Sequence, residues 1–380
     1  MVSEGQKKMS FLKRAKTKAA IQYNGMMILA VRVLLAKRLP RQKLKTVDLS
    51  GKLAIVTGSN TGLGKAMAQY LAEMGATVYL VCRNLEKAEV AKQDILKTVP
   101  TASLHLLQLD TSTLENCRKF CEDWAANGGK TIDMLFHNAG IGCPPSPDNL
   151  FSPDGFEHMY MTNFLSNVVL THGLERFFAP DASVIMTSSP GVFVANFSPD
   201  FEKQSTKNVL EPGFNYIKTA HPNPANSVVY SSTKLMQLCF ARNLMRKWKA
   251  EGKGYIAHAF NPGYAASDFF EKEGVKTSLR KNDLIWWFLT WLKAPMPAAE
   301  GCKTGVMLAI DKSKKVTDKA GFLWDRMKWK TSTIDLYDDK LLERLWDRWC
   351  TDAGVEWSIQ PQDSTTVSKA SVDEPVTEKN

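Results

Sequence analysis

Tyr230 and Lys234 are four positions apart in the segment Tyr-Ser-Ser-Thr-Lys, a spacing that places both side chains on one face of a helix. An unperturbed tyrosine has a pKa of about 10, and a nearby ammonium favours the phenolate and so lowers that pKa. Such a pair is suited to proton transfer near neutral pH. The spacing alone is weak evidence, because two such residues recur by chance on exposed helix faces. A second motif makes it strong.

That second motif is a glycine-rich turn, Thr-Gly-Ser-Asn-Thr-Gly-Leu-Gly, at residues 57–64. It follows an apolar run at 53–57 and precedes a helical pattern at 64–74. A turn of this kind lets bare backbone approach a pyrophosphate at the N-terminus of the helix. The turn therefore predicts a dinucleotide site that includes Gly58, Asn60, Thr61, Gly62, Leu63 and Gly64.

The elements that position these motifs alternate between short apolar runs and longer helical stretches, which is typical of a parallel sheet covered on both faces. Strands are predicted at 53–57, 77–82, 104–109, 132–136, 183–187, 255–260 and 321–324. Helices are predicted at 64–74, 154–176, 230–249, 300–310 and 338–349. We expect a doubly wound, Rossmann-type α/β domain at 47–358, preceded by an arm at 1–46 and followed by a disordered tail at 359–380.

The composition narrows the function classes. The chain has 380 residues, 44% of them hydrophobic, and a formal net charge of +10. Residues 1–46 contain twelve Lys or Arg and one acid, so the rest of the chain is close to neutral. The arm has only Phe11 and Tyr23 as aromatic residues and no reading motif, which argues against nucleic-acid binding.

The seven cysteines form no C-x-x-C pair, and the six histidines form no H-x-x-x-H. This pattern favours a reducing, intracellular compartment and no metal site. We expect a cytoplasmic protein whose arm leaves three interpretations open. The apolar run at 26–36 is too short to span a bilayer. It fits a basic helix on a membrane surface, an acid-poor mitochondrial presequence, or a helix packed on the protein itself.

The two motifs in this order, T-G-x-x-x-G-x-G and then Y-x-x-x-K, resemble the classical short-chain dehydrogenase/reductase family. The resemblance implies a catalytic tetrad of Asn163, Ser189, Tyr230 and Lys234, with Ser188 as the alternative serine. In this family Tyr230 would donate a proton to a carbonyl oxygen, which Ser189 would hydrogen-bond. Lys234 would lower the tyrosine pKa and bind ribose, and Asn163 would connect the lysine to bulk water.

The resemblance also implies further cofactor positions. Asp110, after the third strand, would meet the adenine ring, and Pro262, Gly263 and Ser267 would lie beside the nicotinamide. Asn138, Ala139 and Gly140 match the family's N-A-G, although His137 replaces the usual first asparagine.

Arg83 stands at the end of the second strand, where an acidic residue would repel a 2′-phosphate. An arginine there can hold that phosphate with two hydrogen bonds. Lys65 lies in the first turn of the next helix, where a cation is unfavourable unless an anion is nearby. Together they favour NADP(H), and reduction as the direction in a cell that keeps NADPH high.

Ser189 and Tyr230 are 41 residues apart, more than is common in the family, so the stretch at 196–225 is predicted to loop out beside the site. This insert and the late helix at 341–346 resemble the retinol-dehydrogenase-like branch. The aromatic run at 284–292 suits a lipophilic ketone, aldehyde or alcohol from secondary or lipid metabolism, retinoid-like, steroid-like, or polyketide- or terpenoid-like. A catalytically silent, cofactor-sensing protein on the same fold is the alternative, and a homo-oligomer is compatible with the family.

Overall fold

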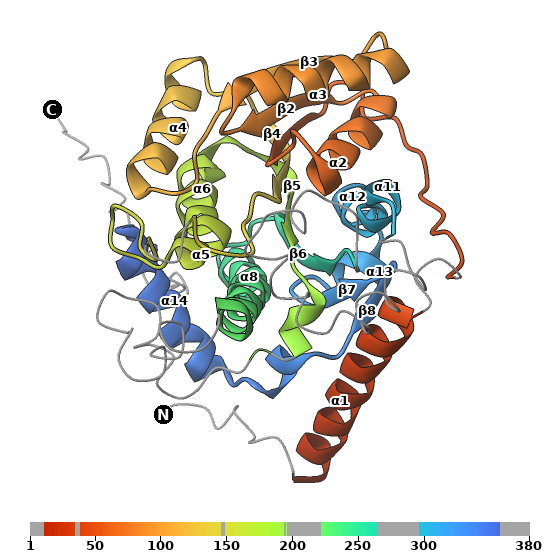
Figure 1. Cartoon of the computed structure of the whole chain (residues 1–380), viewed down its shortest axis with the longest axis vertical. Helices are drawn as coiled ribbons and strands as arrows, with labels where there is room; N and C mark the ends of the chain where they lie inside the picture. Colours follow the sequence, from red (N-terminus) through yellow and green to blue (C-terminus); the bar gives the residue numbers. More distant parts are fainter. Residues whose placement is uncertain are drawn as a thin grey trace, which may run out of the picture.

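The computed structural model describes residues 11–34, 39–145, 149–193, 195, 222–263 and 296–357. Within these residues eight strands form one sheet in the order β3-β2-β1-β4-β5-β6-β7-β8. Neighbouring strands from β3 to β7 are parallel, and β8 is antiparallel to β7. Helices cover both faces of the sheet (Figure 1). The doubly wound α/β fold expected from the sequence is confirmed.

The strands occupy short, mostly buried segments. They are β1 (Leu53–Thr57), β2 (Thr77–Cys82), β3 (Leu104–Gln108), β4 (Ile132–His137), β5 (Phe178–Thr187), β6 (Ile256–Asn261), β7 (Leu323–Asp325) and β8 (Lys328–Lys330). All seven strands expected from the sequence are present, within two residues of their predicted bounds except at the start of β5. The short antiparallel strand β8 was not predicted.

The longer helices are α1 (Phe11–Leu34), α2 (Gly62–Glu73), α3 (Leu85–Thr98), α4 (Leu114–Ala126), α6 (Ser166–Leu174), α8 (Pro222–Ala250), α12 (Lys303–Ile310) and α14 (Asp339–Ala353). The short helical segments are α5 (His158–Tyr160), the π-helical turn η2 (Met161–Leu165), η3 (Glu175–Phe177), η4 (Pro190–Phe193), α11 (Ala298–Gly301), α13 (Lys314–Thr317) and η9 (Thr333–Leu336).

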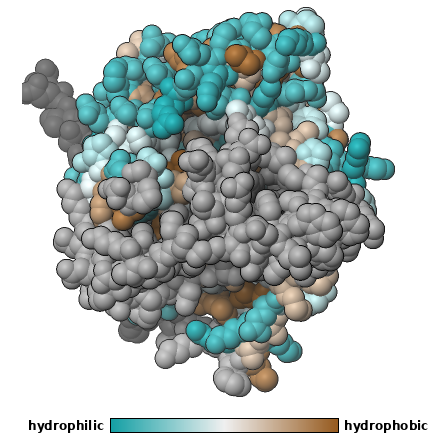
Figure 2. All heavy atoms as spheres, in the orientation of Figure 1, coloured by the Kyte–Doolittle hydropathy of each residue, from teal (hydrophilic) through white to brown (hydrophobic). Residues whose placement is uncertain are grey.

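The sheet separates two apolar layers, as the side-chain alternation of a fully buried strand requires. In β1, Leu53 and Ile55 pack toward α4, α6, α8 and α14, whereas Ala54 and Val56 pack toward α2 and α12. Hydrophilic residues cover the outer surface over α3, at the top of the view in Figure 2. The carboxyl ends of β1, β4 and β5 thus meet on one edge of a rigid sheet, where ligands bind in folds of this type.

The predicted helix at 154–176 differs most from the structure. It begins only at His158, because the Glu157 carboxylate caps it by accepting a hydrogen bond from the Tyr160 N–H at 2.7 Å, while Phe151 and Glu157 form a β-bridge before it. The helix then widens into the π turn η2 and continues as α6. The strand β5 starts at Phe178, earlier than predicted, and pairs with β4 through an irregular register.

The helix α1 packs on the domain along one side only. Ile21 and Ile28 are buried, and Asn24 Nδ2 donates to the Thr331 carbonyl at 2.9 Å. In Figure 1 the helix extends past the lower edge of the sheet beside η4. No helix in the described part of the chain has both the length and the apolar character that crossing a bilayer requires.

Candidate functional site

The glycine turn between β1 and α2 is built for close backbone approach. Gly58 and Gly62 have φ values of +64° and +56°, which disfavour any other residue. A Cβ on Gly64 would lie 2.3 Å from the Gly58 carbonyl oxygen, so the helix can only start this close to the strand with glycine there. The side chain of Thr61 at the N-cap makes no capping hydrogen bond. The first N–H groups of α2 can therefore bind an anion, which fits a dinucleotide pyrophosphate.

A set of hydrogen bonds holds this turn against the end of β4. Thr57 Oγ1 accepts from the N–H groups of Asn138 and Ala139 at 2.9 and 3.1 Å. Asn138 Nδ2 donates to the carbonyls of Thr57 and Gly58, each at 3.1 Å. The side chain of Asn138 thus braces the glycine turn itself. Gly140 follows it, and a Cβ there would lie 3.6 Å from Lys234 Nζ.

Arg83, Lys65 and Asp110 are predicted to bind the adenosine end of the cofactor, and they lie around the ends of β2 and β3. Arg83 is exposed at the end of β2. Lys65 Nζ donates to Asp94 at 2.7 Å, so part of its charge is already balanced, and the lysines beside Asp94 lower the pKa of that carboxyl to about 2. Asp110 Oδ1 accepts from the Ser112 N–H at 3.0 Å and shapes the turn after β3.

The helix α8 brings Tyr230 and Lys234 together at the carboxyl edge of the sheet. Lys234 is 3% exposed, and its Nζ lies 5.5 Å from the centre of the Tyr230 ring. The ammonium donates to the Thr187 carbonyl at 2.9 Å and to Gln237 Oε1 at 3.3 Å. Burial lowers the pKa of Lys234 to about 7. Tyr230 and Lys234, predicted from their spacing to lie together, are thus in contact in the structure.

The two serines after β5 face different ways. Ser188 is buried, and its Oγ donates to the backbone carbonyl of Lys234 at 2.9 Å. Ser189 Oγ accepts from the Gly191 N–H at 3.1 Å, and its side chain hydrogen-bonds Tyr230. Of the two, Ser189 is therefore the serine that shares a site with the tyrosine.

The pKa of Tyr230 departs from the sequence-based expectation. The side chain keeps some exposure, but packing around its hydroxyl raises the pKa to about 12, against the opposing effect of the Ser189 hydrogen bond. The net shift is therefore opposite to the lowering that the sequence led us to expect, because burial outweighs the Ser189 hydrogen bond. The ammonium lies over the ring, and its own charge is weakened by burial. Tyr230 is consequently a neutral acid at pH 7, the form that a proton donor needs.

Asn163 lies in the π turn η2, fully buried. Its Oδ1 accepts from the Ile141 N–H at 2.7 Å, and its Nδ2 donates to the Ile141 carbonyl at 2.9 Å. Nδ2 also approaches Thr233 Oγ1 at 3.2 Å, between Tyr230 and Lys234 on α8. The backbone carbonyl of Asn163 accepts from Gln237 Nε2 at 2.9 Å. Asn163 is thus connected to Lys234 through another residue of α8.

Three contributors to this arrangement were missed from the sequence. Thr187 supplies a carbonyl to Lys234, Thr233 approaches the Asn163 amide, and Gln237 bridges Lys234 and Asn163. Gln237 carried a usable signal, because it lies three residues after Lys234 and therefore on the same helix face. Thr187 acts through its backbone, for which residue type gives no signal.

Several predicted residues can be placed only in part. Pro262 and Gly263 follow β6, where Asn261 Oδ1 accepts from the Gly263 N–H at 2.9 Å. Ser267 and the aromatic run at 284–292 lie outside the described residues, as does the insert at 196–221. Residues 222–225, predicted as part of that insert, belong instead to α8, with Pro222 at its first position.

Comparison with known sequences agrees with this geometry. The family model described as short chain dehydrogenase matches residues 52–198. Human retinol dehydrogenase 11 is 28% identical over 313 residues, which cover 82% of this chain and 88% of that protein. Human retinol dehydrogenase 12 is 29% identical over 315 residues, covering 82% and 89%. The chloroplastic short-chain dehydrogenase TIC 32 A of Brassica napus is 26% identical over 302 residues, covering 80% and 88%.

Solved structures share the fold. An uncharacterised protein of Mycobacterium paratuberculosis superposes with a TM-score of 0.59 at 21% identity, covering 83% of this chain and all of that one. A short-chain dehydrogenase of Shigella flexneri, described as complexed with NADP, has a TM-score of 0.51 at 20% identity and covers 75% of this chain and all of its own. Residues 52–198 thus match the short chain dehydrogenase family, and the chain is similar to the human retinol dehydrogenases 11 and 12 over 82% of its length.

Proposed function

We propose that this chain is an NADP(H)-dependent oxidoreductase that interconverts a lipophilic ketone or aldehyde and its alcohol, with Tyr230 as the general acid and base. The observation that carries the proposal is the convergence of Ser189, Tyr230 and Lys234 at the sheet edge beside the glycine turn. Three polar groups that meet in this way, next to a nucleotide cradle, suit carbonyl chemistry.

The chain's own residues divide the proton chemistry among them. Tyr230, neutral at pH 7, donates its proton to the carbonyl oxygen of the substrate. The Ser189 hydroxyl hydrogen-bonds the same oxygen as negative charge develops there. The Lys234 ammonium stabilises the resulting phenolate, and Asn163 contacts α8 at Thr233, between the tyrosine and the lysine. A bound nicotinamide would supply the hydride that this chemistry needs.

Arg83 supports NADP(H) over NAD(H). Its side chain is exposed at the end of β2, where the adenosine ribose lies in folds of this type. A guanidinium there can hold a 2′-phosphate with charge-assisted hydrogen bonds. Lys65 contributes less to the argument, because it is already paired with Asp94.

The substrate class rests on relatives and on sequence. Human retinol dehydrogenases 11 and 12 are named for a long, apolar alcohol, and the chain covers most of their length. The run Leu-Ile-Trp-Trp-Phe-Leu-Thr-Trp-Leu at 284–292 is rich in the side chains that line apolar pockets. Both favour a retinoid-like or similarly lipophilic substrate.

We also propose that α1 contacts an anionic membrane surface. Its outward side chains include the exposed, apolar Leu12, Tyr23 and Met26. Exposed basic residues lie beside them at Lys13 and Lys16. A helix with this combination binds at an interface by burying apolar area and attracting acidic headgroups.

The test is Tyr230→Phe, which removes the proton donor but keeps the ring. We expect NADPH-dependent reduction of retinaldehyde to fall at least about a hundredfold, as for loss of a general acid, with NADPH binding nearly unchanged. Turnover is measured by NADPH absorbance and binding by calorimetry. Tyr70→Phe, on α2 away from the site, serves as the matched control and should keep full turnover. Full turnover by Tyr230→Phe would refute the mechanism, and NADPH binding without turnover by the wild type would favour the silent, cofactor-sensing protein.

A further inference from the structure

Gln237 directly connects Lys234 to Asn163, the residue that was expected to connect the lysine to bulk water. It is fully buried on α8, three residues after Lys234. Its Oε1 accepts from Lys234 Nζ at 3.3 Å, and its Nε2 donates to the backbone carbonyl of Asn163 at 2.9 Å. One side chain therefore spans the distance from the lysine to the asparagine.

The chemistry of the partners fixes which end of this amide faces which neighbour. An ammonium has only donors and a carbonyl has only lone pairs, so a reversed amide would set donor against donor and acceptor against acceptor. The Asn163 carbonyl also accepts from Asn167 Nδ2 at 3.1 Å, which uses its second lone pair. Gln237 is thus locked in one orientation.

The Asn163 carbonyl that receives these two amides lies in the π turn η2. A π turn shifts backbone hydrogen bonds from the fourth to the fifth residue, and such turns are frequent at functional sites. In η2 this carbonyl faces α8 and receives two side-chain amides, from Gln237 and Asn167. The Gln237 side chain therefore ties α8 directly to the π turn η2.

We propose that Gln237 is a positioning residue of the reaction, which fixes the Lys234 ammonium beside Tyr230 by tying it directly to the Asn163 turn. This inference rests on the proposed function, since it assigns how the lysine of that mechanism is held. A carboxamide keeps its protons at neutral pH. The link therefore orients Lys234 and carries no proton.

The surroundings of Lys234 make this contact influential. The groups that face it are Tyr230 and Gln237 from α8, the Thr187 carbonyl from β5 and the Gly140 backbone from the loop after β4. No acidic side chain among the described residues raises the pKa of the lysine, which burial alone lowers. The amide oxygen of Gln237 is therefore one of few groups that favour the charged lysine.

The test compares Gln237→Met, which keeps the length of the side chain but neither hydrogen bond, with Gln237→Glu, which keeps the acceptor. Loss of a hydrogen bond to a charged group should lower kcat for retinaldehyde reduction about tenfold to a hundredfold in Gln237→Met. In the pH profile of kcat, the rate should fall on the basic side, where Lys234 loses its charge. This basic limb should move to lower pH in Gln237→Met and to higher pH, by about one unit, in Gln237→Glu, because a carboxylate favours the ammonium.

Asn243→Met is the matched control. Asn243 is equally buried on α8, and its Nδ2 donates to the Leu342 carbonyl at 2.7 Å, far along the helix from Tyr230. This variant should lose stability but keep the wild-type kcat and pH profile. A Gln237→Met enzyme with both wild-type values, or limbs that do not move in opposite directions, overturns the inference. If Tyr230→Phe keeps its turnover instead, the proposed function fails and not merely the role of Gln237.

Discussion

The two serines after β5 show how one position along the chain decides chemistry. Both serines contact α8, but at different groups. Ser188 donates to the Lys234 backbone carbonyl, whereas Ser189 hydrogen-bonds the Tyr230 side chain. Moving the hydroxyl by one residue would place it in the packed layer between β5 and α8. The site therefore depends on the register of β5 as much as on the presence of a serine.

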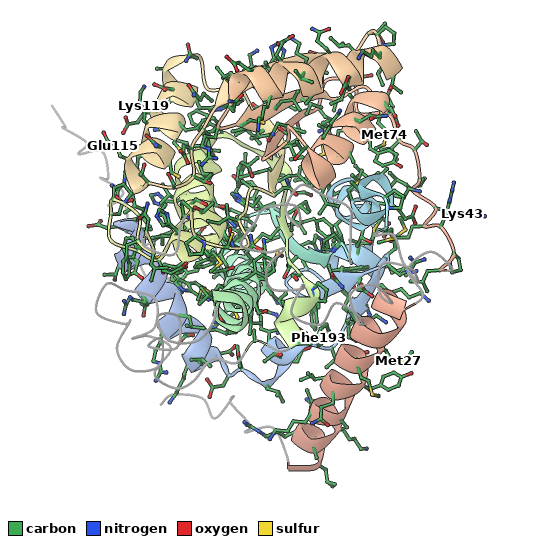
Figure 3. The ribbon with its side chains drawn as sticks, viewed as in Figure 1. Met27, Lys43, Met74, Glu115, Lys119 and Phe193 are labelled. Carbon is green, nitrogen blue, oxygen red and sulfur yellow. The ribbon has the colours of Figure 1, made fainter. Side chains whose placement is uncertain are left out.

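Arg83 gives the sharpest test of cofactor choice at the residue scale. Arg83→Ala removes the guanidinium proposed to hold the 2′-phosphate. A charge-assisted hydrogen bond contributes about 1.5–3 kcal/mol, so KM for NADPH should rise about tenfold to a hundredfold while KM for NADH stays constant. Steady-state kinetics with both cofactors measures this. Lys119→Ala, an exposed cation on α4 (Figure 3), is the control and should change neither value. An equal rise for both cofactors would contradict a phosphate contact.

Spacing alone predicted the residues of the candidate site only where one short motif carries them, whereas Asn163 and Ser189 came from the family resemblance. Tyr230 and Lys234 share a helix face, and the glycines share a turn, so spacing alone brings each set together. The pairing of Lys65 with Asp94 could not be found in this way, because the two lie on different helices, 29 residues apart. The pKa of Tyr230 was also beyond the sequence, since it is set by burial that only the assembled fold determines.

At the scale of elements, α14 packs against the helices that carry the site residues. Its apolar face packs on α6 and α8. Trp349 lies edge-on to Phe164, with ring centres 4.6 Å apart, and Phe164 follows Asn163 in the π turn η2. Trp346 stacks on Phe240 of α8 at 5.5 Å. The helix thus fixes both elements that Gln237 connects.

Trp349→Ala should reveal this support. Trp349 is 1% exposed, and truncation of a buried tryptophan leaves a cavity that costs about 3–5 kcal/mol in the free energy of unfolding. Urea denaturation followed by circular dichroism measures the loss. Trp329→Ala provides the comparison, because Trp329 on β8 is 43% exposed and its removal should cost far less. Equal losses in the two variants would argue that α14 is not part of the core.

The elements themselves were predictable to different degrees. Continuous apolar runs such as β1 and β2 identified the strands, because both faces of each strand are buried. The π turn η2 could not be seen, since its residues are fully buried and show no helical periodicity. The start of β5 at Phe178 was hidden by Pro180 and Asp181, residue types that are depleted in strands.

At the scale of the whole molecule, the segment before β1 is tied to α11 and α12, which pack beside α2 and over β5 and β6. Gln42 is buried, its Nε2 donates to the Glu300 carbonyl at 2.9 Å, and its Oε1 accepts from Thr304 Oγ1 at 2.7 Å. Lys303 Nζ donates to the Gln42 carbonyl at 3.0 Å. This anchor precedes the glycine turn in the chain and fixes where α1 is attached to the domain.

One side of α1 is occupied by the domain, and the other is free to meet a surface. Gly25 is small because a Cβ there would lie 3.1 Å from Phe193 Cβ in η4. Figure 3 shows Phe193, the last residue of η4, next to the helix and Met27 on the side that points away. The packed side, with Ile21 and Ile28, holds the helix in place without using the outer apolar residues.

The double variant Tyr23→Ser and Met26→Ser therefore tests membrane contact without disturbing the packed side. Tyr23 and Met26 are 58% and 62% exposed, so the fold should not need them, and loss of their burial should weaken binding to vesicles of phosphatidylserine and phosphatidylcholine at least about tenfold. Sedimentation with vesicles measures this, and retinaldehyde reduction in solution should be unchanged. Val90→Ser, which changes an equally exposed apolar residue on α3, should bind like the wild type.

Binding of the wild type to these vesicles should also fall with added salt and be lost on phosphatidylcholine alone, since Lys13 and Lys16 need an acidic surface. If the double variant sediments with the vesicles as fully as the wild type, the proposed membrane contact is wrong, and α1 packs only on its own domain.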